Sequence, residues 1–154
     1  MVSSFIPTNS AITADNPPVK NDGWYPDLDP DDFKKVTGLP AIHGPERLSA
    51  ELQSAMIEVN ASIASWRAIQ TVSSLANVVS AAYGDETEKL VLYRLAVFYR
   101  ARAEFVATER DYDATKDGHA KADALEPTAS DWKRKSQETL ARLTGRSRAV
   151  VELI

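Results

Sequence analysis

The sequence contains no cysteine. Disulfide bonds, thiolate zinc sites and cysteine nucleophiles are therefore excluded. Histidine is almost as scarce, since only His43 and His119 occur, each next to a glycine. A paired-histidine metal site needs helical or hairpin spacing together with a carboxylate, and neither histidine has this setting. We expect both histidines to lie on the surface, and we expect no metal and no cofactor.

Long hydrophobic runs are also missing. No stretch approaches the roughly 18 apolar residues that indicate a membrane-spanning helix, so we expect no membrane partner. The first residues, MVSSFIPTNS, have no charged segment and no sustained apolar run, which is not the pattern of a signal peptide.

Motifs of catalysis are the third absence. The chain has no phosphate-binding loop, nucleophile elbow or dinucleotide fingerprint. The acidic stretch 27–38 resembles a calcium loop only in its first aspartates. Its sixth position is Asp32 instead of glycine and its twelfth is Gly38 instead of glutamate, so helix capping explains the aspartates better. We therefore expect no enzyme.

Charge of both signs is plentiful but uneven. The chain has 22 acidic and 18 basic residues and a net charge of −4, which disfavours nucleic-acid binding by the whole surface. Residues 1–47 carry seven acids and four bases, whereas residues 128–154 carry three acids and six bases. The basic side chains near the carboxyl end form either a solvated helix face or a set of sequence-independent phosphate contacts. They are Lys133, Arg134, Lys135, Arg142, Arg146 and Arg148.

Helical patterns fill the middle of the chain. Residues 1–23 hold prolines and asparagines without periodicity and predict an extended arm. Asp29 as an N-cap, Pro30 at the first helical position and a stop at Gly38 predict a short helix. A helix over about 45–70 follows, with apolar residues at every third or fourth position. These residues are Leu48, Leu52, Met56, Val59, Ile63 and Trp66.

The second half of the chain predicts two more long helices. Residues 71–84 are rich in serine, valine and alanine and are expected to be a connector. A helix is predicted over about 85–113, and from Leu90 to Tyr99 it is apolar on nearly all sides, since only Arg94 is polar there. It is therefore either central in a bundle or buried between subunits. The last helix, about 119–144, is kinked or restarted by Pro127 and has Leu125, Trp132, Leu140 and Leu143 on its buried side.

The predicted fold is therefore all-α, a small bundle of one short and three long helices with an extended arm at each end. The expected parts are an arm at 1–23, a helical body at 24–145 and a tail at 146–154. In the tail, valine and isoleucine favour an extended strand, which is unstable alone in water. It either packs on its own bundle or adds to the sheet edge of another protein.

Four stretches resemble the head completion proteins of P2-like contractile-tailed bacteriophages. They are WYPDLDPDDF, RLSAELQSAMIEVN, YRLAVFYRARAEF and KADALEPTASDWKRKSQETLARLTGRSRAVVELI. The similarity runs from about residue 20 to the carboxyl end and is weak over 71–89. It implies a structural protein of the virion neck, assembled in the host bacterial cytoplasm. Such a protein forms an adaptor ring that docks on the portal after DNA packaging, extends the DNA channel and provides the platform for tail attachment.

The resemblance also implies partners and sites. The partners are further copies of the chain in a dodecameric ring, the portal protein, the tail terminator or tail completion protein, and the packaged DNA that passes through the channel. The tail is implied to bind the portal through Arg146, Ser147, Arg148, Ala149, Val150, Val151, Glu152, Leu153 and Ile154. From the apolar pattern we expect contacts between subunits at Leu92, Val97 and Phe98. Lys133, Arg134 and Arg142 are candidates to face the DNA.

Two other functions are compatible with the sequence. One is a small DNA-binding packaging factor similar to a terminase small subunit, although no helix-turn-helix spacing is evident. The other is a helical regulator that binds a single partner helix.

Overall fold

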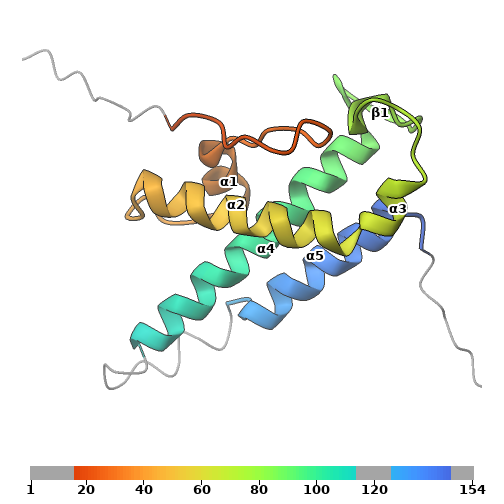
Figure 1. Cartoon of the computed structure of the whole chain (residues 1–154). Coiled ribbons are helices and arrows are strands. Elements are labelled where there is room, and N and C mark those ends of the chain that lie inside the picture. The colour runs from red at the N-terminus through yellow and green to blue at the C-terminus, as the bar shows by residue number, and fades with distance from the viewer. Residues whose placement is uncertain (1–15, 114–125, 147–154) are drawn as a thin grey trace, which may run out of the picture.

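The computed structural model describes residues 16–113 and 126–146 of the chain. In these residues the protein is mainly α-helical, with one 3₁₀ turn and one two-stranded hairpin, so the predicted all-α class is confirmed (Figure 1). The elements are α1 (Pro30–Thr37), α2 (Pro45–Ser62), α3 (Ala64–Ala68), η1 (Leu75–Asn77), β1 (Ala82–Tyr83), β2 (Glu86–Thr87), α4 (Glu88–Asp113) and α5 (Ala129–Leu143).

Helix α4 is the centre of the molecule. It packs on α1, α2 and α5, and it contacts η1 and β2 as well (Figure 1). Helix α5 runs antiparallel to it, because Lys89 near the start of α4 meets Leu143, whereas Glu104 meets Lys133. The fully buried side chains of α4 are distributed around much of its circumference, as the sequence predicts for a central helix. They are Tyr93, Ala96, Val97, Phe98, Ala101, Ala103 and Phe105.

Helix α1 begins and ends where its capping residues predict. The Asp29 side chain accepts a hydrogen bond from the backbone N–H of Asp31, and Pro30 occupies the first turn. Gly38 ends the helix in the left-handed conformation, with φ of 66°, which a residue with a Cβ rarely adopts. Phe33 places its ring in the core against Phe98 and Phe105.

The expected single helix over 45–70 is two helices. Helix α2 ends at Ser62 and α3 begins at Ala64, because Ile63 leaves the helical conformation with φ −111° and ψ 16°. Ile63 is nevertheless buried, together with the predicted apolar stripe of α2. No glycine or proline marks this break in the sequence. Because Ile63 stays buried, the break redirects the chain while the apolar stripe remains in the core.

The start of α4 also differs from the prediction. Asp85 and Glu86 were expected in the first helical turn, but they belong to a hairpin in which Tyr83 pairs with Glu86. Gly84 makes the tight turn with φ of 65°. The two-residue Gly-Asp turn is itself a sequence signal for a hairpin. The helix therefore begins only at Glu88.

Helix α5 is a restart after Pro127. The Thr128 side chain accepts a hydrogen bond from the Asp131 backbone N–H, and the Asp131 carboxylate accepts one from the Thr128 backbone N–H, which completes a capping box. The helix ends at Leu143, and Gly145 follows the C-cap Thr144 with φ of 71°. The backbone N–H groups of Gly145 and Arg146 donate to the carbonyls of Arg142 and Ala141, which is the Schellman pattern. The start predicted at 119 and the residue Leu125 lie outside the described residues, as does His119.

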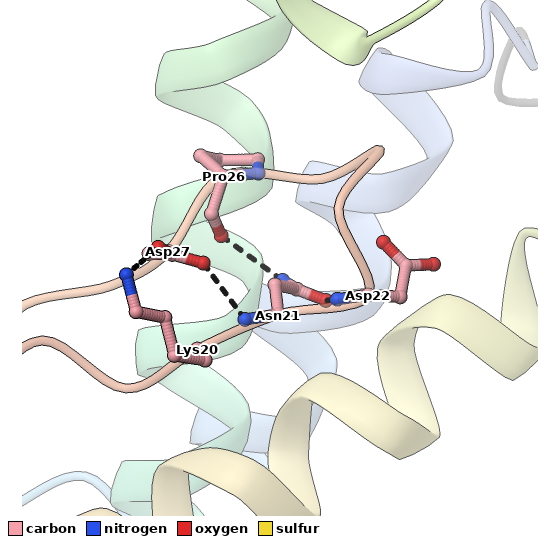
Figure 2. Close-up of polar contacts among 5 residues, drawn as sticks. All are labelled: Lys20, Asn21, Asp22, Pro26 and Asp27. Carbon is pink, nitrogen blue, oxygen red and sulfur yellow. Dashed lines mark hydrogen bonds and ion pairs between the residues drawn. The ribbon is translucent and has the colours of Figure 1, made fainter.

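Residues 16–28 form a loop that packs on the helices, so the described part of the predicted arm belongs to the body. Val19 is buried in the core and pairs with Leu28 through two backbone hydrogen bonds. Figure 2 shows the polar contacts that hold the loop, in which Asp27 accepts from the Lys20 ammonium and from the Asn21 backbone. These two donors lower the pKa of the Asp27 carboxyl, the backbone hydrogen bond most. The body therefore extends at least to Asn16, instead of beginning at residue 24.

A closed ring of hydrogen bonds ties this loop to two helices. The Tyr93 hydroxyl of α4 donates to Asn60 of α2 at 2.6 Å, Asn60 donates to Asn21 at 3.0 Å, and Asn21 donates back to the Tyr93 hydroxyl at 2.8 Å. The Tyr25 ring stacks on the Tyr93 ring at 4.7 Å. Burial raises the pKa of Tyr25 to about 12 and raises that of Tyr93 further. The aromatic motif WY therefore forms part of the core.

Candidate assembly surfaces

His43 lies at a nearly buried polar site near the end of α4, which corrects the expectation of a surface histidine. Its ring contacts the Phe105 ring at 4.7 Å, and its Nε2 lies 3.2 Å from Glu109 Oε1. The other carboxylate oxygen of Glu109 lies 3.7 Å from Arg102 Nη1. Arg102 is 8% exposed, and its Nε makes no hydrogen bond among the described residues. This cluster fastens the loop before α2 to α4.

The acidic residues at 27–31 are occupied by protein partners. Asp29 caps α1, and the Asp31 carboxylate receives hydrogen bonds from Lys34 and Asn16, which lower its pKa. Within residues 16–113 and 126–146, no group of three or more histidine, cysteine, aspartate or glutamate side chains could hold a metal ion. None of the described helices is long and apolar enough to cross a membrane.

A pocket lies between α2, α4 and α5, and two of its polar side chains are engaged with other groups of the chain. Glu58 on its α2 side forms an ion pair with Arg100 of α4. The Ser136 hydroxyl on its α5 side donates to the Ala96 carbonyl at 2.7 Å. These contacts join α2 and α5 to α4, so they stabilise the packing of the three helices.

The three residues expected near DNA differ in their surroundings. Lys133 is half-buried and lies 3.5 Å from Glu104 of α4. Arg134 is exposed and lies 3.3 Å from Asp131, whose pKa is lowered chiefly by the hydrogen bond from the Thr128 backbone. Arg142 is exposed in the last turn of α5. Of these three residues, Arg134 and Arg142 are therefore exposed, whereas Lys133 is half-buried beside Glu104.

The three residues expected between subunits also differ in how exposed they are. Val97 and Phe98 are 0% exposed, so they have no surface for another subunit and pack inside their own chain. This part of the prediction is wrong, because the apolar character of α4 reflects its central position. Leu92 is partly buried against the core and keeps some accessible surface.

The predicted tail begins at one end of the bundle. Arg146 is its only described residue, and Ser147 to Ile154 lie outside the described residues. At this end the Lys89 ammonium donates to the Leu143 carbonyl at 2.5 Å and lies 5.9 Å from the centre of the Trp66 ring. The start of α4, α3 and the end of α5 therefore meet where the tail leaves the body (Figure 1).

Sequence reasoning missed three exposed apolar side chains on the connector between α3 and α4. Ile69 is 74% exposed, Val79 96% and Tyr83 64%. We refer to these three residues as the connector surface. Its signal in the sequence is the stretch 68–84, the longest in the chain without Asp, Glu, Lys or Arg.

These features define a helical protein whose polar side chains serve packing and whose exposed segments are suited to contact other proteins. Residues 19–154 match the family described as Phage head completion protein (GPL), and the chain belongs to this family. The chain is also similar to the head completion/stabilization protein of Escherichia phage P2, with 30% identity over 143 residues, which covers 91% of this chain and 85% of the relative. No solved structure matches the chain.

Proposed function

We propose that this protein completes the phage head as an adaptor that docks on the portal after DNA packaging, extends the DNA channel and provides the platform for the tail. The observation that carries the proposal is the family match, which covers nearly the whole described body. The similarity to a head completion/stabilization protein supports it. A structural role also agrees with polar clusters that are engaged in packing.

The tail is the proposed contact with the portal. Residues 146–154 are β-prone, and in a strand Ala149, Val151 and Leu153 would share one apolar face, which suits addition to the sheet edge of a partner. The Schellman turn at Gly145 supports this role, because it ends α5 before the apolar run begins.

A ring is the proposed form of the assembly. Head-to-tail contacts between identical subunits form a closed ring when the rotation between them closes, and a dodecamer is the expected size. Leu92 is the remaining candidate for a contact between subunits, since it keeps accessible surface on α4. Lys133, Arg134 and Arg142 are proposed to face the DNA, and the tail terminator is proposed to bind the opposite side of the ring.

Co-expression with the portal protein of the same genome tests the proposal. The full chain and a chain that ends after Arg146 are each purified through a tag on the portal, and the mass of the complex is measured. The truncation keeps Arg146 because its backbone N–H caps α5. We expect the full chain to join the portal as a ring and the truncated chain to remain folded but unbound.

A matched pair of substitutions sharpens the assignment of the tail. Val151→Asp places an uncompensated charge where an apolar side chain is expected to be buried, and should abolish portal binding. Glu152→Gln keeps the size and the backbone pattern and should leave binding intact. Wild-type binding by the truncated chain or by Val151→Asp would refute the tail as the contact. A salt-sensitive complex with DNA in place of portal binding would favour the packaging-factor alternative.

A further inference from the structure

We propose that the connector surface, formed by Ile69, Val79 and Tyr83, is a second portal-docking surface beside the tail. The proposal rests on the function proposed above, since it names a further contact with the same partner.

The first argument is the combination of exposure and missing charge. The side chains of this surface are 74%, 96% and 64% exposed, and no charged residue occurs in the 17 positions from 68 to 84. Of the described residues in that stretch, only Leu75 is buried. Single exposed apolar residues are common, but a long exposed stretch without charge is not, because surface segments of globular proteins usually carry charged side chains. Depletion of charge with a tyrosine present is typical of the core of a protein interface.

The second argument is that the connector is held in a defined position. Leu75 is buried, and its backbone N–H donates to the Trp24 carbonyl at 2.9 Å. The Trp24 indole N–H donates to the Val72 carbonyl at 3.0 Å, and the Glu88 N–H donates to the Ala81 carbonyl at 2.8 Å. The exposed side chains thus extend from an anchored backbone. The connector would therefore lose little conformational entropy when a partner binds it.

The third argument is position relative to the tail. Ile69 caps α3, and the hairpin that holds Tyr83 leads directly into α4. Lys89 joins the start of α4 to Leu143 at the end of α5, and Arg146 caps that end, so the connector and the start of the predicted tail lie at the same end of the described body. The eight residues after Arg146 can span at most roughly 26–29 Å when extended. A partner that holds the tail must therefore approach this end.

The fourth argument concerns charge beside the surface. Arg67 lies over the Trp24 ring at 4.0 Å, Lys89 is engaged with Leu143, and Glu86 is paired with Arg94. Asp85 adds an exposed negative charge next to Tyr83. No cation is thus offered to a phosphate beside the apolar side chains, which disfavours DNA as the occupant. The proposal therefore requires an uncharged apolar surface on the portal.

The test compares two triple variants of the full chain in the portal co-expression assay. The connector variant carries Ile69→Ser, Val79→Ser and Tyr83→Ser. The control carries Val36→Ser, Ile42→Ser and Ile57→Ser, which are 49%, 84% and 66% exposed on α1, the following loop and α2. We expect the connector variant to bind the portal about tenfold more weakly or worse, whereas the control binds within about twofold of wild type. Both should melt within a few degrees of the wild-type chain.

Each outcome decides the proposal. If the wild-type chain does not bind the portal, the proposed function is overturned and this inference falls with it. If the wild-type chain and the connector variant bind equally, the inference alone is overturned. Equal loss of portal binding in the control variant also overturns the inference, because the effect would then not be specific to the connector surface. Loss of self-association with portal binding retained overturns it as well, because the surface would then contact a second copy of the chain. If the triple variant melts early, Val79→Lys replaces it, since Val79 is almost fully exposed and its substitution should not affect folding.

Discussion

Helix α4 is charged yet largely buried, whereas the connector before it is uncharged yet largely exposed. The helix is rich in charge, yet seven of its side chains have no exposed surface and Arg102 is 8% exposed. The connector has no charge over 17 residues, yet most of it faces solvent. The difference teaches that apolar character alone does not separate a core from an interface. Position in the bundle makes α4 a core element, and exposure makes the connector a candidate interface.

The largest expected effect follows from the core side of this comparison. Phe98→Ala should lower the free energy of unfolding by about 3–5 kcal/mol, because Phe98 is fully buried and its ring lies 5.6 Å from the Phe33 ring. Denaturation by urea, followed by circular dichroism, measures this loss. A change below about 1 kcal/mol would mean that Phe98 is accessible after all, as an interface residue would be.

A smaller loss is expected where α4 holds its neighbours through polar contacts. Tyr93→Phe removes the hydroxyl that donates to Asn60 and accepts from Asn21. The Asn60 side-chain oxygen and one of the Asn21 amide hydrogens lose this partner at a partly buried site, which should cost about 1–3 kcal/mol. The same urea denaturation measures it. Tyr83→Phe is the matched control, since the Tyr83 side chain is 64% exposed and its hydroxyl should contribute almost nothing. Equal stability of the two variants would contradict the closed ring of hydrogen bonds.

A still smaller effect should appear where the connector meets α4. The hydrogen bond and ion pair with Arg94 lower the pKa of Glu86 from its ordinary value of 4.5. A carboxyl whose pKa is lower in the folded state stabilises the protein above the unfolded value and loses that contribution as pH falls through the folded one. Glu86→Gln should therefore cost a few tenths of a kcal/mol at pH 7 and nothing at pH 2–3, because the pair is partly solvated. Stability curves measured at several pH values would show whether this difference converges, and a constant difference would contradict the pair.

The smallest effect is expected on the connector surface itself. Val79→Ser should change the free energy of unfolding by less than about 0.5 kcal/mol, because the side chain is 96% exposed. Thermal melting of the isolated protein checks this. A loss above about 1 kcal/mol would show that the connector contributes to the core, and the contrast with α4 would disappear.

Local chemistry decided which elements could be predicted from the sequence. The ends of α1 and the restart of α5 depend on caps within a few residues, such as Asp29, Gly38 and Thr128, and the structure agrees with the caps at Asp29 and Gly38. The break at Ile63 carries no glycine or proline, so it depends on tertiary packing that the periodic pattern does not encode. The hairpin before α4 did have a signal in Gly84 and Asp85, but the nearby acidic residues also suit a helix start.

The candidate surfaces were harder to predict than the fold. Val97 and Phe98 were expected between subunits because a helical segment that is apolar nearly all round, such as 90–99, is buried either in its own bundle or between subunits. The sequence does not contain the neighbours that distinguish these two explanations. Trp132 was expected in the core, yet it is half-buried and packs on Tyr99 at 5.7 Å. His43 was expected on the surface. Its nearly buried setting depends on a contact with Glu109, 66 positions away, which a local sequence pattern does not reveal.

The anchoring of Leu75 has a consequence for how the connector can vary between related phages. Because Leu75 is buried and bonded to Trp24, the connector consists of two short loops instead of one long one. Doubling the length of a flexible loop costs only about 0.6 kcal/mol in closure entropy. Insertions or substitutions on either side of Leu75 should therefore leave the fold intact while they change the outer surface. The recognition of a partner could then diverge at this position without loss of the helical body.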